Sequence, residues 1–427
     1  MNIKALYEIF LEYKSVCTDT RKIKKGDIYF ALKGDNFDGN TFAHQALEDG
    51  ANYCVIDNES IADESEKFIL VKDALATLQQ LANYYRKTFK FPIIALTGSN
   101  GKTTTKELIN SVLSSEYKVR ATKGNLNNHI GVPLTLLSFE TDLDFGIVEM
   151  GANHQKEIEF LCSIAEPDYG LITNFGKAHL EGFGGVEGVI KGKSELYEFI
   201  KTNNKTAFIN TDDATQLKQI NDYRNVSTFG SKAKNDAYIE FKSANPFVNV
   251  IYKNLEIKSQ LIGSYNFSNI AVAIAIGQYF NLKLSSIKST IESYKPNNNR
   301  SEIKQIGSNK VILDAYNANP TSMLAALSNF KNLKEVNKYL FLGDMFELGK
   351  TANEEHQAIV NFAQHNFGEN IYFIGENFFK TKTNTSSLKY KTFENLKKHL
   401  EITKIENACI LIKGSRGMAL ERILEIL

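Results

Sequence analysis

The stretch Thr97-Gly-Ser-Asn-Gly-Lys-Thr-Thr104 decides how the centre of this chain folds. The apolar run before it, Pro92-Ile-Ile-Ala-Leu-Thr97, predicts a buried strand, and residues 105–113 have the pattern of a helix. Gly98 and Gly101 let backbone N–H groups turn towards an anion, and the N-terminus of the following helix adds its dipole. The stretch therefore predicts a loop that binds phosphate.

Two side chains of this loop point to ATP. Lys102 can reach the outer phosphates of a nucleotide, and the Thr103 hydroxyl is placed to coordinate Mg²⁺. The common form of the loop has a glycine where this chain has Leu96, so the generic pattern fails at that one position. The alternative is a tight turn with an exposed lysine, and the order of strand, glycines, lysine and threonines favours ATP over it. The loop does not name the reaction, because kinases, GTPases, motors and ligases all share it.

The composition excludes several classes of protein. The 427 residues carry a net charge of +1, which argues against a general nucleic-acid-binding protein. A hydrophobic content of 43% is enough for substantial cores and excludes a wholly disordered chain. The 4 cysteines are scattered without CxxC spacing, so neither a disulfide framework nor a zinc cluster is indicated.

The N-terminus has acidic residues where a signal peptide needs an apolar core. Ile3, Leu6 and Phe10 instead repeat at helical spacing. The most apolar stretch, Ile270 to Gly277, is too short to span a bilayer. We expect a soluble protein of the reducing cytoplasm, without a membrane anchor.

Two boundaries divide the chain. The first lies near residue 90, between a helical pattern over 75–90 and the Pro92 strand, and the second is the polar run Lys295-Pro-Asn-Asn-Asn-Arg300. Strands alternate with helical patterns after it, which predicts a mostly parallel, doubly wound sheet. The expected strands are Val311–Asp314, Lys338–Leu342, Ile371–Ile374 and Ala408–Ile412. We expect three α/β domains, at residues 1–89, 90–299 and 300–427.

Three further segments carry chemistry that is ambiguous when each is taken alone. Glu149 follows a strand-like run and would face a Mg²⁺ held at the phosphate loop, although such a carboxylate can equally cap a loop. His179 follows Ile172-Thr-Asn-Phe-Gly-Lys-Ala, and a single histidine is more often structural than a ligand. Lys193 lies in Lys191-Gly-Lys-Ser-Glu-Leu-Tyr197, which begins an amphipathic helix whose lysines are by default solvated.

Together with the phosphate loop, these segments resemble the Mur ligases of peptidoglycan precursor synthesis, and the resemblance extends over the whole chain. It implies three domains: a small UDP-binding domain, a central P-loop ATPase domain and a C-terminal Rossmann-like domain. Gly263-Ser-Tyr-Asn-Phe-Ser-Asn269 resembles the family's segment near the adenine, with Tyr265 in place of the usual histidine. Asn298-Asn-Arg300-Ser-Glu resembles the link into the third domain.

Four segments resemble the family member that joins D-alanyl-D-alanine to UDP-N-acetylmuramoyl-tripeptide. They are Asn125-Leu-Asn-Asn-His-Ile-Gly-Val-Pro133, Asp314-Ala-Tyr-Asn-Ala-Asn-Pro-Thr-Ser-Met323, Gly343-Asp-Met-Phe-Glu-Leu-Gly349 with His356, and Ile412-Lys-Gly-Ser-Arg-Gly-Met418. His129 stands where glutamate is frequent. In the first domain, Cys17-Thr-Asp-Thr-Arg21, Gly26-Asp-Ile-Tyr-Phe-Ala-Leu-Lys-Gly34 and Asp38-Gly-Asn40 look like the UDP-binding part.

Other functions remain possible from the sequence alone. The preceding ligase of the series adds a diamino acid, and its usual Asp-Asn-Pro-Arg motif is absent here. Folylpolyglutamate synthetase shares the ATP site but lacks a first domain of the UDP-binding type. A P-loop kinase or nucleotide switch would not need the third domain, and a non-catalytic scaffold would not need the ATP-site residues.

The resemblance also implies roles for individual residues. ATP would contact Gly98, Ser99, Asn100, Gly101, Lys102, Thr103, Thr104, Asn266, Asn269, Arg300 and Asp314. Thr103 and Glu149 would hold one Mg²⁺, and His179 with a Lys193 carbamylated by CO₂ would hold a second. The catalytic residues would be Lys102, Asn128, His179 and Lys193. The UDP-linked substrate would contact Thr20, Arg21, Lys33, Gly34, Asp38 and Gly39, and the dipeptide Asn317, Asn319 and Arg416.

The implied chemistry is amide formation. In the family, the substrate carboxylate attacks the γ-phosphate of ATP to give an acyl phosphate, and an amine then displaces phosphate. Lys102, Arg300 and Mg²⁺ would supply the countercharge that holds the two anions together. The resemblance further implies hinges at both domain junctions and a monomer that acts on small molecules, not on nucleic acid. No motif identifies the third residue of the tripeptide.

Overall fold

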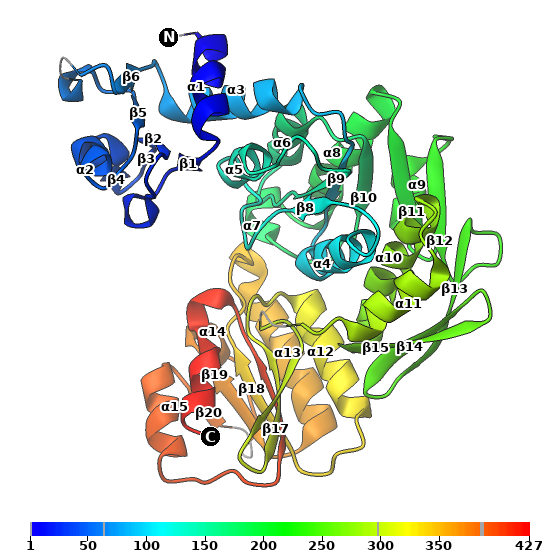
Figure 1. Ribbon diagram of the computed structural model, residues 1–427. Coiled ribbons are helices and arrows are strands. Elements are labelled where there is room, and N and C mark those ends of the chain that lie inside the picture. Colours follow the sequence, from blue (N-terminus) through cyan, green and yellow to red (C-terminus); the bar gives the residue numbers. More distant parts are fainter. Residues whose placement is uncertain (1, 63–64, 297–298, 385–387) are drawn as a thin grey trace.

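A computed structural model describes residues 2–62, 65–296, 299–384 and 388–427. The chain forms three units, each built on its own sheet, with the C-terminal unit below the other two in Figure 1. Two of the six residues in the polar run expected at the second boundary, Asn297 and Asn298, lie outside the described residues.

The N-terminal unit has a small parallel sheet in the order β1-β2-β5-β6. These strands are β1 (Val16–Cys17), β2 (Ile28–Phe30), β5 (Tyr53–Ile56) and β6 (Phe68–Leu70), with a separate hairpin of β3 (Lys33–Gly34) and β4 (Phe37–Asp38). The helix expected from the spacing of apolar residues at the N-terminus is confirmed as α1 (Ile3–Tyr13), and its Leu6 and Phe10 are buried. Helix α2 (Ala43–Glu48) lies against β5.

Helix α3 (Ala74–Arg86) joins this unit to the central one. It packs against α1 and also against α5 (Gly131–Leu137) and α6 (Glu157–Ala165) of the central unit. The Tyr85 hydroxyl donates to the carbonyl of Phe139 at 2.7 Å, and the buried Arg86 donates to Asp168 Oδ2 at 2.8 Å. These contacts fix the N-terminal unit on the central unit.

The central unit contains a nine-stranded sheet in the order β15-β14-β13-β12-β11-β10-β7-β9-β8. Strands β8 (Val119–Ala121), β9 (Phe145–Glu149), β7 (Ile93–Thr97), β10 (Tyr169–Ile172), β11 (Thr206–Asn210) and β12 (Val226–Gly230) run parallel. An antiparallel ribbon follows, of β13 (Ala237–Ala244), β14 (Phe247–Tyr252) and β15 (Leu255–Ile262), which the sequence did not indicate. The strand expected before the phosphate loop is confirmed as β7.

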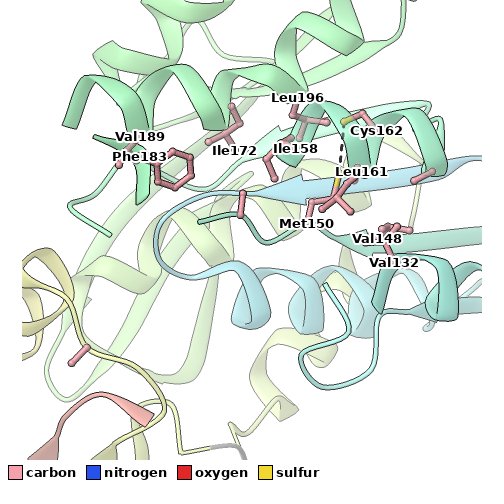
Figure 2. Packing of buried hydrophobic residues seen from close by; sticks show 14 of the residues in the cluster. Val132, Val148, Met150, Ile158, Leu161, Cys162, Ile172, Phe183, Val189 and Leu196 are labelled. Atoms are coloured by element: carbon pink, nitrogen blue, oxygen red, sulfur yellow. Dashed lines mark hydrogen bonds between the residues drawn. The ribbon is translucent and has the colours of Figure 1, made fainter. Parts of the chain in front are cut away.

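Helices cover both faces of the parallel strands, and alternate residues of β7 enter different cores. Ile94 and Leu96 pack towards α4 (Lys102–Leu113), α10 (Phe267–Tyr279) and α11 (Leu284–Ser293). Ile93 and Ala95 belong to the core with α3, α5, α6 and α8 (Val186–Thr202). Figure 2 shows that second core, in which Met150 lies close to Cys162 beneath α6 and α8. The same packing therefore holds α8 against the strand end that carries Glu149.

The C-terminal unit contains a six-stranded sheet in the order β16-β17-β21-β18-β19-β20. Its strands are β16 (Glu302–Ile306), β17 (Asn309–Asp314), β18 (Lys338–Gly343), β19 (Ile371–Ile374), β20 (Leu388–Tyr390) and β21 (Cys409–Lys413). All pairs are parallel except β16 with β17, which confirms the mostly parallel sheet expected there. The helices are α12 (Pro320–Asn332), α13 (Ala352–Phe367), α14 (Glu376–Phe379) and α15 (Phe393–Leu400).

The apolar segment from Ile270 to Gly277 is the buried middle of α10. Within the described ranges, no helix combines the length and the apolarity that a membrane span requires. The cysteines Cys17, Cys54, Cys162 and Cys409 are all free thiols.

Candidate active site

The phosphate loop joins β7 to α4, and its glycines are required by its shape. Gly98 has a φ of 141°, and a Cβ there would collide with Thr173 Oγ1. Gly101 has a φ of 80°, and a Cβ there would lie 2.8 Å from Asn269 Oδ1. The loop is tied to the segment after β10, because the Asn100 N–H donates to Asn174 Oδ1 at 3.1 Å. This geometry leaves the N-terminus of α4 open towards a ligand.

The loop faces a cavity of about 530 Å³ that residues of the central and C-terminal units line together. The structure brings fourteen of the predicted site residues to this one space. They are Ser99, Asn100, Gly101, Lys102, Thr103, Thr104, Asn128, Glu149, His179, Asn266, Asn269, Arg300, Asp314 and Asn317. Of the other predicted residues, Asn319 contacts the loop through its side chain, which donates to Asn100 Oδ1 at 2.7 Å.

Glu149 and Thr103 form a compact pair of oxygen ligands. The Thr103 hydroxyl donates to Glu149 Oε2 at 3.1 Å, and Glu149 is only 2% exposed. Asn127 Nδ2 donates to the other carboxylate oxygen at 2.9 Å, and Lys106 Nζ lies 3.8 Å from Oε2. A hydroxyl and a carboxylate beside a phosphate loop fit Mg²⁺, which keeps waters and takes its remaining ligands from phosphates. Within the described residues, no group of three His, Cys, Asp or Glu side chains could hold a metal ion.

Lys193 is 1% exposed, and Figure 2 shows the core in which its helix is embedded. Its Nζ donates to the Ala152 carbonyl at 3.0 Å and lies 4.9 Å from the centre of the Phe183 ring. Burial, and then the positive charge of Lys102, lower the pKa of Lys193 well below its ordinary value. A lowered pKa favours the neutral amine, which is the form that reacts with CO₂.

Three polar residues line the part of the cavity formed by η4 (Ser264–Asn266) and α10. Asn269 Nδ2 donates to Asn266 Oδ1 at 2.8 Å, and the Thr105 hydroxyl donates to Asn269 Oδ1 at 3.0 Å. Tyr265 contacts the C-terminal unit, since its hydroxyl lies 2.7 Å from Ser301 Oγ. Burial raises the pKa of Tyr265, so its hydroxyl is neutral.

Positive groups of the C-terminal unit gather around Tyr316 at the cavity wall. The guanidinium of Arg300 lies 3.8 Å from the centre of the Tyr316 ring, and that of Arg416 lies 5.6 Å from it. The buried Lys413 pairs with Asp314 at 2.5 Å. The cavity therefore presents cations from two units to a negatively charged ligand.

Comparisons with known proteins agree over the whole chain. Residues 96–277 match the family model described as the Mur ligase middle domain. Residues 299–416 match the "Mur ligase, glutamate ligase domain", and residues 12–86 match the "Mur ligase family, catalytic domain".

Two curated relatives carry the name UDP-N-acetylmuramoyl-tripeptide–D-alanyl-D-alanine ligase. That of Bacillus subtilis is 34% identical over 425 residues, covering 96% of this chain and 92% of the relative. That of Escherichia coli is 33% identical over 430 residues, covering 97% and 93%. The chain belongs to the Mur ligase family.

Solved structures of Mur ligases share the fold. The crystal structure of MurF from Acinetobacter baumannii superposes with a TM-score of 0.83 at 29% identity, covering 97% of this chain and 93% of that one. MurF from Thermotoga maritima in complex with ADP gives a TM-score of 0.85 at 25% identity, covering 97% of both chains.

The remaining predicted residues of this Mur ligase lie outside the cavity wall. Gly98 forms the base of the loop, Lys193 lies behind the wall, and Arg416 is exposed beside Tyr316. The six residues expected to bind UDP lie in the N-terminal unit, and none of them lines the cavity. They are Thr20, Arg21, Lys33, Gly34, Asp38 and Gly39.

The charged residues among these six form ion pairs or hydrogen bonds within the N-terminal unit. Arg21 lies 2.8 Å from Asp19, and Lys33 lies 2.8 Å from Asp57. Asp38 Oδ1 accepts from the backbone N–H of Asn40 at 2.9 Å. The structure thus places these residues on one unit and does not bring them to the phosphate loop.

One expected boundary is wrong. The helix expected to begin at Lys191 begins at Val186, directly after Gly185. Gly188, in the first turn, obscured this start in the sequence, and Gly192 lies further along the same helix. They serve packing instead, since a Cβ at either position would collide with Phe183.

Five residues at the site were given no role by the sequence. Asn127, Tyr316, Glu347 and Lys413 lie inside motifs that the sequence had marked, so the signal was present but did not single them out. Lys106 lies outside every motif that the sequence had marked. It follows Thr103 by three positions on α4, and that spacing places both side chains on the face towards Glu149.

The Lys102 ammonium predicts how nucleotide binding depends on pH. Burial lowers the pKa of Lys102 to about 8, an effect that Glu149 opposes and Arg300 reinforces. A triphosphate favours the charged form, so binding must return a proton to Lys102 once the pH exceeds that value. We predict that affinity for ATP falls above about pH 8, by up to roughly tenfold per pH unit.

Calorimetry of ATP binding at about pH 9, in buffers of different ionisation enthalpy, measures that proton uptake directly. Lys102→Arg is the control, because a guanidinium stays charged and takes up no proton. The prediction is contradicted if both proteins bind with the same number of protons.

Proposed function

We propose that this Mur ligase joins D-alanyl-D-alanine to UDP-N-acetylmuramoyl-tripeptide with the use of ATP, forming UDP-N-acetylmuramoyl-pentapeptide, ADP and phosphate. The observation that carries the proposal is the single cavity where the phosphate loop and Glu149 of one unit meet Arg300 and the Asp314–Asn317 segment of the other. The names of relatives at 33–34% identity over nearly the full chain support the choice of substrates. The complex of Thermotoga maritima MurF with ADP supports adenine nucleotide at the loop.

Each of the proposed domains would bind one of the three substrates. Residues 1–89 would bind the UDP end of the muramoyl substrate, residues 90–299 would bind ATP, and residues 300–427 would bind the dipeptide. Asn317, which lines the cavity, and Arg416, beside Tyr316, lie on the side from which the dipeptide would approach. Arg416 offers a cation for the carboxylate of the dipeptide.

Mg²⁺, when bound, neutralises charge on the phosphates and orients them. Thr103 and Glu149 would hold one ion, and Asn127 keeps the Glu149 carboxylate oriented by a hydrogen bond of 2.9 Å. His179 and the modified Lys193 would help to hold a second ion. The loop residues from Gly98 to Thr104 would hold the triphosphate.

Carbamylation of Lys193 requires a neutral amine, which burial favours by lowering the pKa of the side chain. The Nζ lone pair forms a bond to the carbon of CO₂, and one N–H proton leaves to solvent. The product carries a negative charge and two acceptor oxygens, which the free side chain lacks. An unmodified ammonium could not coordinate a metal ion.

Amide formation then proceeds by positioning and charge. The tripeptide carboxylate attacks the γ-phosphorus of ATP, ADP leaves, and the dipeptide amine displaces phosphate from the acyl phosphate. Lys102 and Arg300 counter the charge of the phosphates. Asn128 is anchored because its Oδ1 accepts from Gly131 N–H at 2.8 Å, which leaves its amide N–H groups for the reacting carboxylate. The two units that enclose the cavity exclude water, which would hydrolyse the acyl phosphate.

We further propose that the enzyme works in the cytoplasm as a monomer on small molecules, without nucleic acid. The near-neutral net charge of +1 supports the exclusion of nucleic acid. The free state of the cysteines suits a reducing compartment.

The proposed reaction predicts strict dependence on both substrates. Phosphate release from ATP should require UDP-N-acetylmuramoyl-tripeptide together with D-alanyl-D-alanine, with the pentapeptide as product. Single amino acids should not replace the dipeptide. Turnover of the UDP-linked dipeptide with one diamino acid would instead assign the chain to the preceding ligase of the series. The absence of activity with every muramoyl substrate would refute the substrate assignment.

Replacing Lys193 tests the carbamate. Lys193→Ala should reduce kcat by about 100-fold or more, because the second metal ion loses a ligand, and short carboxylic acids added to the buffer should restore part of the activity. Lys191→Ala is the matched control, since Lys191 lies two residues earlier on the same helix and is exposed. Full activity of Lys193→Ala would rule out the carbamate, and loss without rescue would reduce Lys193 to a structural role.

A further inference from the structure

Glu347 joins the C-terminal unit to a proposed metal ligand of the central unit. It lies in the loop between β18 and α13, and its carboxylate Oε2 accepts a hydrogen bond from Nδ1 of His179. Its backbone carbonyl also accepts from the Glu181 N–H, at 3.3 Å, in helix α7 (Leu180–Phe183). One residue therefore contacts α7 through both its side chain and its main chain.

Both partners have backbone conformations that side-chain-bearing residues rarely adopt. The φ of His179 is 52° and that of Glu347 is 61°. Such conformations persist only where the surroundings enforce them, and they are concentrated at functional sites. The contact is thus built into the two loops and is not a chance meeting of surface side chains.

The loop that carries Glu347 is anchored on both sides within its own unit. The Met345 N–H donates to Nε2 of the buried His356 at 3.0 Å, and the Phe346 N–H donates to Ser415 Oγ at 3.0 Å. His356 Nδ1 in turn donates to the Ala352 carbonyl at 2.6 Å. These bonds fix where the Glu347 side chain begins, although that side chain is 54% exposed.

We propose that Glu347 is a positioning residue for the second metal site. By accepting a hydrogen bond from the Nδ1–H of His179, it keeps the proton on Nδ1 and leaves the Nε2 lone pair free for a metal ion once the C-terminal unit is docked. The inference rests on the proposed function, which makes His179 a ligand. Histidines that bind metals generally donate their other ring N–H to a carboxylate or carbonyl, which fixes the tautomer and the ring orientation. Without this acceptor, either ring nitrogen can carry the proton.

The charge of Glu347 suits this task. A carboxylate has only acceptor oxygens, so its bond to the His179 Nδ1–H is charge-assisted and favours the tautomer with the proton on Nδ1. Because donor and acceptor come from different units, docking and metal affinity are coupled. Docking strengthens metal binding, and by thermodynamic reciprocity metal binding strengthens docking.

A second glutamate of the same interface provides a matched control. Glu355 pairs with Lys177 at 2.5 Å, so it also joins the C-terminal unit to the segment before α7. No hydrogen bond or ion pair joins Glu355 to His179 in the described part of the chain. Its replacement removes one partly exposed ion pair, whose contribution to docking is small, and leaves the hydrogen-bond acceptor of His179 in place.

The test is Mn²⁺ binding to the full-length protein, measured by electron paramagnetic resonance in the presence of a non-hydrolysable ATP analogue. The wild type should bind two ions. Glu347→Ala should weaken only the second by about 10- to 100-fold, the usual effect of losing such a partner. Glu347→Gln retains an acceptor oxygen and should lose less affinity for the second ion. Glu355→Gln should leave both affinities within about twofold of the wild type.

Nitrogen NMR of ¹⁵N-histidine-labelled protein reports the tautomer of His179 itself, which a metal affinity does not. His179 should carry its proton on Nδ1 in the wild type and in Glu355→Gln, and should redistribute it to Nε2 in Glu347→Ala. The inference is overturned if Glu347→Ala and Glu355→Gln weaken binding of the second ion equally. It is also overturned if His179 keeps its proton on Nδ1 in Glu347→Ala. A wild type that binds a single Mn²⁺ overturns it together with the proposed second metal site, whereas ligase turnover, measured separately, decides the proposed function.

Discussion

Two anions must be brought into contact in this site, and Coulomb repulsion opposes it unless positive charge surrounds them. A carboxylate that attacks a triphosphate meets up to four negative charges, and the local protein supplies the balance. Lys102 and Lys106 come from α4, and Arg300 comes from the start of the C-terminal unit. The cations therefore come from two separate units, and the site is complete only where the two units meet.

The interface between those units serves the chemistry as well as the architecture. Asn319 of the C-terminal unit contacts the phosphate loop, Glu355 pairs with Lys177, and Glu347 contacts His179. All three bonds reach the phosphate loop or the segment that follows β10. A docked C-terminal unit thereby covers the reacting groups, and it also sets the geometry of the residues that would hold nucleotide and metal.

Local patterns in the sequence predicted much of the site, because the phosphate loop is built from neighbours in the chain. Gly98, Gly101, Lys102 and Thr103 need only a strand before them and a helix after them. Lys106 escaped notice because its function depends on Glu149, a residue on another strand. The start of α8 was misplaced because Gly188 weakens the helical pattern there, and its tight packing on Phe183 is visible only in three dimensions.

The part that sequence reasoning could not reach is the contact between units. Glu347 was inside a recognised motif, yet nothing in the motif says that its side chain reaches His179, which lies far earlier in the chain. The antiparallel ribbon of β13 to β15 was missed for a related reason, since strand pairing is decided by partners and not by propensity.

The central claim, that the site brings a substrate carboxylate against the γ-phosphate of ATP, is tested most directly by isotope transfer. UDP-N-acetylmuramoyl-tripeptide labelled with ¹⁸O in its terminal carboxylate is turned over with ATP and D-alanyl-D-alanine, and the released phosphate is analysed by mass. Direct attack predicts one ¹⁸O in each phosphate formed from doubly labelled substrate. Phosphate that carries no label, alongside normal formation of the pentapeptide, would contradict the account.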